Sequence, residues 1–385
     1  MKSTSINCSH IALSKTIALA TKAKELLDAK KDIVNLTAGE PDFSSPPNVR
    51  EYIKKNIDSF KIAYTNVQGI IELRKEIVKK LEEENNLVYH PDQIVVSNGA
   101  KHSLFNSFLS ILNPGDEVII FSPYWVSYVE QARLLNTEPL IVETKFENGF
   151  LPKKEDILKK LSKKTKLILL NSPNNPTGVV YPKETLKMIA EIALENDLYV
   201  VSDEIYEKLT YGKKHLSILN VVPEIKNRTF LINGVSKAYA MTGWRIGYMA
   251  APEELIEIVA KAQSHTTSNA NTLAQYAALE ALRNSSEYTE FMHSKFKERR
   301  EYVRKRLKNM GLRFPNPDGA FYFFFESPYG SGEEFCINIL EKSGVVLVPG
   351  NAFGMDSFIR MTYAASMENL KKGLDRLEKY ISTIR

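Results

Sequence analysis

The chain has 385 residues, 43% of them hydrophobic, so it is long enough to bury a large core and to form two domains. Lysine and arginine total 51 against 46 for aspartate and glutamate, and the net charge of +5 is spread over segments of mixed sign such as residues 79–84. This dispersal excludes the concentrated basic footprint of a nucleic-acid-binding protein.

The cysteines and the N-terminal region indicate a protein of the reduced cytoplasm. Cys8 and Cys336 lie far apart and in no metal-ligand spacing. The apolar run at residues 17–20 is short and is soon followed by Lys22 and Lys24, so we expect neither a signal peptide nor a membrane span. The six histidines show no HExxH-type spacing, no serine or cysteine lies in a nucleophile elbow, and we expect no metal.

The first 90 residues predict three helices and one short strand. Amphipathic patterns indicate helices over residues 14–31, 46–59 and 70–86, and an apolar run indicates a strand at 33–36. The strand leads into Thr37-Ala38-Gly39-Glu40-Pro41. Gly39 lets the backbone approach a ligand closely, although an ordinary turn explains the same residues.

From about residue 93 to 250, strands alternate with amphipathic helices. Apolar runs predict strands at 93–96, 117–121, 139–142, 167–170, 198–201, 229–232 and 246–249. Continuous apolar strands separated by helices indicate an α/β fold whose mostly parallel sheet is covered on both faces. Ligands bind such sheets beyond the carboxyl ends of the strands, so the polar residues there are the candidate site.

Two of these strand ends carry backbone or aromatic groups suited to a ligand. Gly99, Ala100 and Lys101 open a helix over 101–112, whose free N–H groups can hold an anion. No GxGxxG or Walker A motif occurs in the chain, which counts against a dinucleotide-dependent dehydrogenase or an NTPase. Trp125 follows the second strand, where an indole can stack on a flat ring or simply pack in the core.

Two further strand ends carry polar side chains. Asn175 lies in a turn rich in asparagine and proline after the fourth strand. Asp203 follows the fifth strand, where a carboxylate is costly to bury without a cationic partner such as a protonated pyridine nitrogen. Tyr206 lies one turn further on. The alternative for Asp203 is a capping role, which we consider the weaker interpretation.

The stretch from Gly234 to Tyr248, GVSKAYAMTGWRIGY, places Lys237 just after a buried strand. Partial desolvation there lowers the lysine pKa and leaves amine free to attack a carbonyl. Arg245 is suited to hold a phosphate through two hydrogen bonds. Together they suggest an aldehyde that carries phosphate, whereas each residue alone would suggest an ordinary surface side chain.

Beyond residue 250 the pattern predicts helices over 254–264, 272–284 and 286–310, then a smaller α+β unit with strands at 320–325, 345–348 and 358–363. Arg360 lies in the last of these strands, where a lone guanidinium needs an anionic partner. We expect a large domain over 46–290 and a discontinuous small domain of 1–45 and 291–385 that closes over the substrate.

Taken together, these motifs resemble the class I and II aminotransferases, fold-type I enzymes that use pyridoxal 5'-phosphate (PLP). The resemblance runs from about Leu36 to Asn369 and is greatest to the prokaryotic aspartate aminotransferase branch. That branch has Ser-Pro-Tyr-Trp, Ser-Pro-Asn-Asn-Pro-Thr-Gly and Met-Thr-Gly-Trp-Arg in the places of residues 122–125, 172–178 and 241–245. It implies a seven-stranded, mostly parallel sheet with a smaller α+β domain, and a homodimer.

The resemblance also implies roles for individual residues. Lys237 would hold PLP as an aldimine and, once released, move the Cα proton as general base and acid. Asp203 would keep the ring nitrogen protonated, Tyr206 and a cis-bonded Asn175 would contact the phenolic oxygen, and Trp125 would stack on the ring. The phosphate would be held by Gly99, Ala100, Lys101, Ser236, Arg245 and, from the neighbouring subunit, Tyr64. The substrate α-carboxylate would be oriented by Arg360, Asn175, Trp125 and the backbone at Gly39.

Two positions depart from the family pattern. Many relatives carry serine or threonine where this chain has Gly234, and some carry a hydroxyl residue in place of Ala100. Phosphate binding is therefore expected to depend on backbone, Ser236 and Arg245.

The implied reaction is ping-pong transamination of L-aspartate with 2-oxoglutarate, giving oxaloacetate and L-glutamate. Lys101, with Thr16 nearby, resembles the residue that faces the distal carboxylate. Aromatic amino acids or prephenate, and a β-lyase reaction on sulfur amino acids, remain alternatives. The sensor half of a transcription regulator is disfavoured because only about 30 residues precede the first motif, and an inactive relative is disfavoured because Lys237, Asp203, Arg245 and Arg360 are all present.

Overall fold

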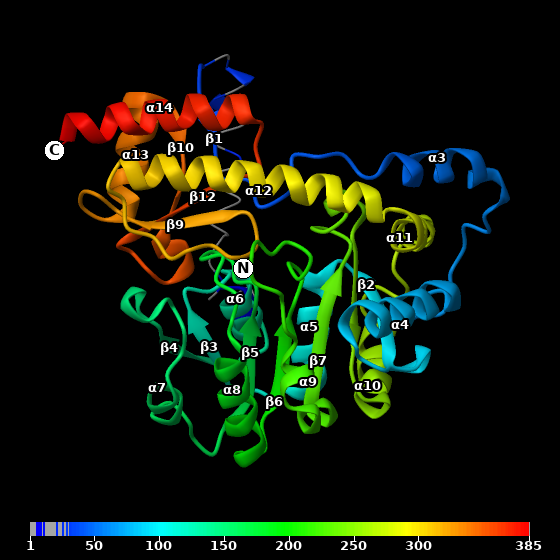
Figure 1. The fold of residues 1–385 in the computed structure, drawn as a ribbon. Helices are drawn as coiled ribbons and strands as arrows, with labels where there is room; N and C mark the ends of the chain where they lie inside the picture. The colour runs from blue at the N-terminus through cyan, green and yellow to red at the C-terminus, as the bar shows by residue number, and fades with distance from the viewer. Residues whose placement is uncertain are drawn as a thin grey trace, which may run out of the picture.

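The computed structural model describes residues 5–9, 11, 21, 25–26, 28–29 and 31–384. A large α/β part surrounds a seven-stranded sheet, and a smaller α+β part lies against one edge of it (Figure 1). Thr16 and most of the helix expected over 14–31 lie outside the described residues. Within that described portion, no helix combines the length and the apolar character needed to cross a membrane.

The large sheet contains the seven strands expected from the apolar runs. They are β2 (Ile94–Asn98), β3 (Glu117–Ser122), β4 (Glu138–Glu143), β5 (Thr165–Asn171), β6 (Tyr199–Asp203), β7 (Thr229–Gly234) and β8 (Ile246–Ala250). Their order is β2-β8-β7-β6-β5-β3-β4. Strand β8 is antiparallel to both neighbours, while the β7-β6-β5-β3-β4 pairings are parallel. The α/β fold with a mostly parallel sheet is therefore confirmed.

The reversed strand β8 explains how Arg245 reaches the candidate site. Because β8 runs against its neighbours, its first residue lies at the same edge of the sheet as the last residues of β2 and β7. Arg245 comes directly before that first residue. The carboxyl edge of the sheet therefore contains residues at the ends of β2, β3, β5, β6 and β7, together with Arg245, which precedes β8.

Helices cover both faces of the sheet, which is why the strands are apolar throughout. Ile168 and Leu170 belong to the core cluster on one face, while Leu167 and Leu169 belong to the cluster on the other. Successive side chains of a strand point to opposite faces, so two covered faces require an unbroken apolar run. The helices of this part are α3 (Pro47–Asn56), α4 (Ile71–Asn85), α5 (Ala100–Ile111), α6 (Ser127–Leu134), α7 (Lys154–Leu158), α8 (Lys183–Glu195), α9 (Ile218–Val221), α10 (Glu253–Ser264) and α11 (Thr272–Asn284); the short α1 (Ile6–Ser9) packs against α6.

The smaller part contains two small sheets. Strands β9 (Tyr322–Glu326), β11 (Val348–Pro349) and β12 (Phe358–Thr362) form an antiparallel sheet in the order β11-β12-β9, and β1 (Val34–Asn35) pairs in parallel with β10 (Val345–Val346). The single strand expected over 345–348 is thus divided at Leu347, because its first half bonds to β1 and its second half to β12.

The core of the smaller part joins the two ends of the chain. Val34 and Leu36 pack in one cluster with residues of α12 (Ser286–Asn309), α13 (Gly332–Ser343) and α14 (Met367–Ile384). Helix α12 begins beside α11 and extends along the smaller part (Figure 1). This packing supports the proposed division into residues 46–290 and a discontinuous unit of 1–45 and 291–385.

Candidate active site

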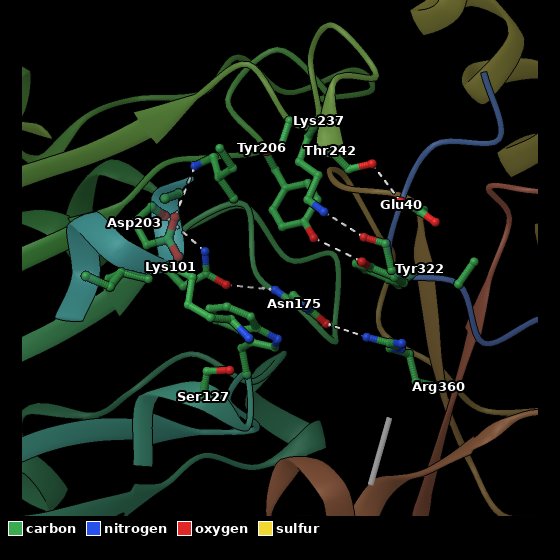
Figure 2. Close-up of a pocket in the computed structure, with 18 of the residues that line it drawn as sticks. Glu40, Lys101, Ser127, Asn175, Asp203, Tyr206, Lys237, Thr242, Tyr322 and Arg360 are labelled. Atoms are coloured by element: carbon green, nitrogen blue, oxygen red, sulfur yellow. Dashed lines mark hydrogen bonds between the residues drawn. The ribbon is translucent and has the colours of Figure 1, made fainter. Parts of the chain in front are cut away.

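A cavity of about 620 Å³ lies at the carboxyl edge of the large sheet and is lined by residues of both parts of the molecule. Most of the candidate residues line it (Figure 2): Gly39, Ala100, Lys101, Trp125, Asn175, Asp203, Tyr206, Ser236, Lys237, Arg245 and Arg360. Gly99 lies just behind Arg245. Tyr64 is not among the lining residues and is 90% exposed.

Lys237 points into the cavity from the loop that follows β7. Its Nζ donates a hydrogen bond of 2.7 Å to the carbonyl oxygen of Gly39. Burial lowers the pKa of Lys237 to about 8, and the positive charges of Arg245 and Arg360 add to that effect. A substantial fraction of the amine is therefore neutral near physiological pH, as a nucleophile or a proton acceptor requires.

Asp203 ends strand β6 and is 3% exposed. Its carboxylate accepts hydrogen bonds from the Tyr128 hydroxyl (2.7 Å) and the backbone N–H of Ile205 (3.3 Å). No salt bridge to Asp203 is found among the residues that the structure describes. Burial raises the pKa of Asp203 to about 6. The carboxylate therefore lacks the direct cationic partner that would stabilise its charge, and it lies where a ligand with an N–H⁺ group can supply one.

Arg360 lies in the middle of β12 and is likewise 3% exposed. Its guanidinium donates to Asn175 Oδ1 (3.1 Å) and to the backbone oxygen of Thr37 (2.8 Å), while its Nε finds no partner among the residues described. The rings of Tyr322 and Phe353 lie 4.5 and 4.9 Å from it. A buried guanidinium whose hydrogen-bond acceptors are neutral is a site for a carboxylate.

Arg245 and Lys101 form a second positively charged region beside the start of α5. Arg245 adopts a left-handed backbone conformation (φ +57°) and donates to the backbone oxygen of Thr242 (2.9 Å). A Cβ atom at Gly99 would meet its guanidinium, which would have to move, and the φ of +81° at Gly99 disfavours a side chain there in any case. The Lys101 Nζ lies 4.7 Å from the centre of the Trp125 ring, and burial together with Arg245 lowers the pKa of Lys101. Arg245 beside the free N–H groups of the helix start suits a phosphate, and Lys101 offers a further positive charge to an anionic ligand.

Sequence reasoning missed several polar residues of the site, and three of them contact predicted residues directly: Tyr322, Tyr128 and Asn171. Tyr322 Oη lies 2.9 Å from Tyr206 Oη inside the cavity. Tyr128 donates to Asp203, and Asn171 links neighbouring strand ends by donating to the Asp203 backbone oxygen (3.0 Å) and accepting from the Asn175 N–H (2.9 Å). Tyr322 carries the one hydroxyl within the aromatic run 321–325, which is the signal that could have identified it. The Asn175–Pro176 bond is cis, as expected.

Comparison with known proteins decides the family. Residues 31–377 match the family model of aminotransferase class I and II. The chain belongs to the class I and II aminotransferases.

This aminotransferase is similar over nearly its full length to enzymes of the aspartate aminotransferase group. It is 46% identical to an aspartate aminotransferase of Thermotoga maritima over 97% of this chain and 98% of that protein. It is 43% identical to an aspartate/prephenate aminotransferase of Thermus thermophilus, with 96% of each chain covered. The structure of the Thermus thermophilus aspartate aminotransferase with maleate superposes with a TM-score of 0.95 at 41% identity, covering 98% of this chain and 100% of that one. The chain is therefore an aspartate aminotransferase-like enzyme of a PLP-dependent family.

The buried charge of Asp203 gives a stability prediction for the chain without cofactor. Because the folded-state pKa is raised above that of the unfolded chain, the contribution of Asp203 to stability is present below about pH 4 and is lost as the pH rises through about 6. We expect Asp203→Asn to raise the free energy of unfolding at pH 8 by roughly 1–3 kcal/mol, and to raise it little at pH 4.5. Urea unfolding of the cofactor-free chain at both pH values measures this difference.

The matched control is Asp58→Asn, which removes an exposed carboxylate. It should change the free energy of unfolding by no more than about 0.5 kcal/mol at either pH. Lower stability of Asp203→Asn than of the wild type at pH 8 would show that the buried charge is already satisfied within the protein.

Proposed function

We propose that this aminotransferase uses PLP to transfer the amino group of L-aspartate to 2-oxoglutarate, giving oxaloacetate and L-glutamate. One observation carries the proposal: Lys237, Asp203 and Arg360 converge on one cavity, and within the described part of the chain neither the buried carboxylate nor the buried guanidinium has a salt-bridge partner. The names of the Thermotoga maritima and Thermus thermophilus relatives support the choice of substrate.

The residues of the cavity fit PLP group by group. The amine of Lys237, partly neutral near physiological pH, suits the aldehyde, and the buried Asp203 suits the protonated ring nitrogen. Arg245, Ser236 and the start of α5 at Gly99, Ala100 and Lys101 suit the phosphate, Trp125 suits the ring face, and Asn175 and Tyr206 suit the phenolic oxygen. When bound, the cofactor supplies an electron sink for the carbanion formed at the substrate Cα.

The chain itself supplies orientation and proton transfer. Arg360 and Asn175 bind the substrate α-carboxylate, because Arg360 has a spare Nε donor and neutral partners that a carboxylate can replace. This contact turns the Cα–H bond toward Lys237. With a pKa of about 8, Lys237 can take the proton from Cα and return it, as general base and then general acid.

The distribution of charge favours a substrate with two carboxylates. Once Arg245 holds a phosphate and Arg360 an α-carboxylate, Lys101 is the cation that remains on the cavity wall. Its ammonium lies over the Trp125 ring, with no salt-bridge partner among the described residues. A distal carboxylate would provide that partner. The name of the Thermus relative supports prephenate as a second amino acceptor.

The central test is spectroscopic. The visible absorbance of the PLP-loaded chain should disappear on addition of L-aspartate alone and return on addition of 2-oxoglutarate, because each half-reaction alters the cofactor. Lys237→Ala should lack the cycle and lose about 10²–10⁴-fold or more in turnover. Lys183→Ala, which removes an exposed lysine, is the control and should behave as the wild type. Release of pyruvate and ammonia from sulfur amino acids without cycling would indicate a β-lyase instead.

Substrate choice is tested by Lys101→Met, which keeps the apolar stem and removes the charge. We expect kcat/KM for L-aspartate to fall about 10–100-fold, the effect of one lost charge-assisted hydrogen bond, and that for L-phenylalanine to change less than about threefold. If kcat/KM instead falls equally for both amino acids and PLP binds more weakly, Lys101 contacts the phosphate and not the distal carboxylate.

We also propose a homodimer in which Tyr64 reaches the phosphate in the neighbouring subunit. Tyr64 is 90% exposed, and Ile57 and Ile62 on the same segment are 40% and 57% exposed, which is typical of a surface that another chain covers.

The dimer proposal predicts that the wild type sediments with the mass of two chains. It also predicts that Tyr64→Phe binds PLP about tenfold more weakly, because the variant loses a hydrogen bond to the charged phosphate. Tyr329→Phe removes the hydroxyl of another exposed tyrosine and should leave PLP affinity unchanged. A monomeric wild type with full activity would contradict the proposal.

A further inference from the structure

The segment from Thr37 to Phe43 contacts two of the cations that face the cavity, Arg360 and Lys237. The backbone oxygen of Thr37 accepts a hydrogen bond from Arg360 (2.8 Å), and that of Gly39 accepts one from Lys237 Nζ (2.7 Å). The position of this segment therefore decides where the free Lys237 amine lies.

Glu40 links the segment to the loop that carries the lysine. Its carboxylate accepts a hydrogen bond of 2.6 Å from the hydroxyl of Thr242, which begins the short helical turn leading to Arg245. In Figure 2, Glu40 and Thr242 face one another across the rim of the cavity, on the Lys237 side. The hydrogen bond holds a negative charge at this point of the rim.

The charged groups that act on Lys237 are two anions, Glu40 and Asp203, and two cations, Arg245 and Arg360. The hydroxyl groups of Tyr206 and Tyr322 line the same cavity. Among the charged groups Glu40 has the largest effect and raises the pKa of Lys237, against the lowering by burial and by the two arginines. Asp203 acts more weakly, and its carboxylate is bound by Tyr128. Glu40 is therefore the principal anion for the lysine.

The rest of the segment is anchored independently of Glu40. Asp42 accepts a hydrogen bond of 2.6 Å from Arg299 of α12. The Phe43 ring lies 4.9 Å from the Arg299 guanidinium and packs edge-on against Phe296 at 5.4 Å. Removing the charge of Glu40 should thus leave the backbone in place, so an effect on Lys237 can be assigned to the charge.

Building on the proposed function, we propose that Glu40 is a positioning residue for Lys237. Its carboxylate, fixed by the Thr242 hydroxyl, places a negative charge beside the lysine, whose amine already donates to the Gly39 carbonyl. The amine released during the reaction is thereby kept next to the substrate Cα and retains a proton that it can return.

The test measures the lysine itself, without cofactor. The full-length chain is freed of PLP and labelled with acetic anhydride at a series of pH values, and mass spectrometry of the peptide containing Lys237 gives the midpoint of its acetylation. In Glu40→Gln, which keeps an acceptor for Thr242, we expect the midpoint to fall by about half a unit to one unit, since the carboxylate is exposed and partly screened. Asp42→Asn is the control, with a carboxylate on the same segment that faces α12, and its midpoint should equal that of the wild type.

An unchanged midpoint in Glu40→Gln, or an equal fall in Glu40→Gln and Asp42→Asn, would overturn the proposal. Either outcome is distinct from failure of the proposed function, because the labelling is done without PLP and amino acid. Failure of the function would appear instead as a Lys237→Ala chain whose cofactor absorbance still cycles with L-aspartate and 2-oxoglutarate.

Discussion

Charge that is buried without opposite charge is the constraint on which the rest of the structure depends. Arg360 is surrounded by the neutral acceptors of Asn175 and Thr37 and by aromatic rings, and Asp203 receives hydrogen bonds, as far as the chain is described, only from Tyr128 and the backbone. Both arrangements destabilise the protein by itself. Such costs are typical of sites where a ligand supplies the missing charge. A carboxylate beside Arg360 could come from an amino-acid substrate. A cation beside Asp203 could come from a protonated heteroaromatic cofactor.

The sheet brings these charges together without long loops. Asn171 and Asp203 end neighbouring parallel strands, and the side chain of Asn171 bonds to the backbone of Asp203, so their relative position is rigid. Glycines allow the remaining elements to come close: a side chain at Gly247 would collide with the backbone at Ala100, and one at Gly234 would crowd Gly247. This close packing accounts for glycine at positions 234 and 247 in this chain, and it brings the start of α5 next to Arg245.

Much of this arrangement was predictable from sequence for a physical reason. A sheet covered on both faces requires continuous apolar strands, so a polar residue such as Asp203 at the end of one marks the edge where ligands bind. Tyr128 could not be found in this way, because the face of α6 that meets Asp203 is set by tertiary packing. The division of residues 345–348 also escaped prediction, since it depends on pairing with β1 at the opposite end of the chain. The site roles themselves came from resemblance to a family, whereas the pairing of Glu40 with Thr242 required the structure.

The most direct measurement is a crystal structure of the chain grown with PLP and a dicarboxylate such as maleate. We predict electron density continuous from Lys237 Nζ to the cofactor, a ring nitrogen within hydrogen-bonding distance of Asp203, one carboxylate on Arg360 in place of its neutral partners, and the other carboxylate on Lys101. A cofactor bound away from Asp203, or an Arg360 that keeps Asn175 and Thr37 with no carboxylate beside it, would contradict the view that these buried charges exist to be matched by ligands.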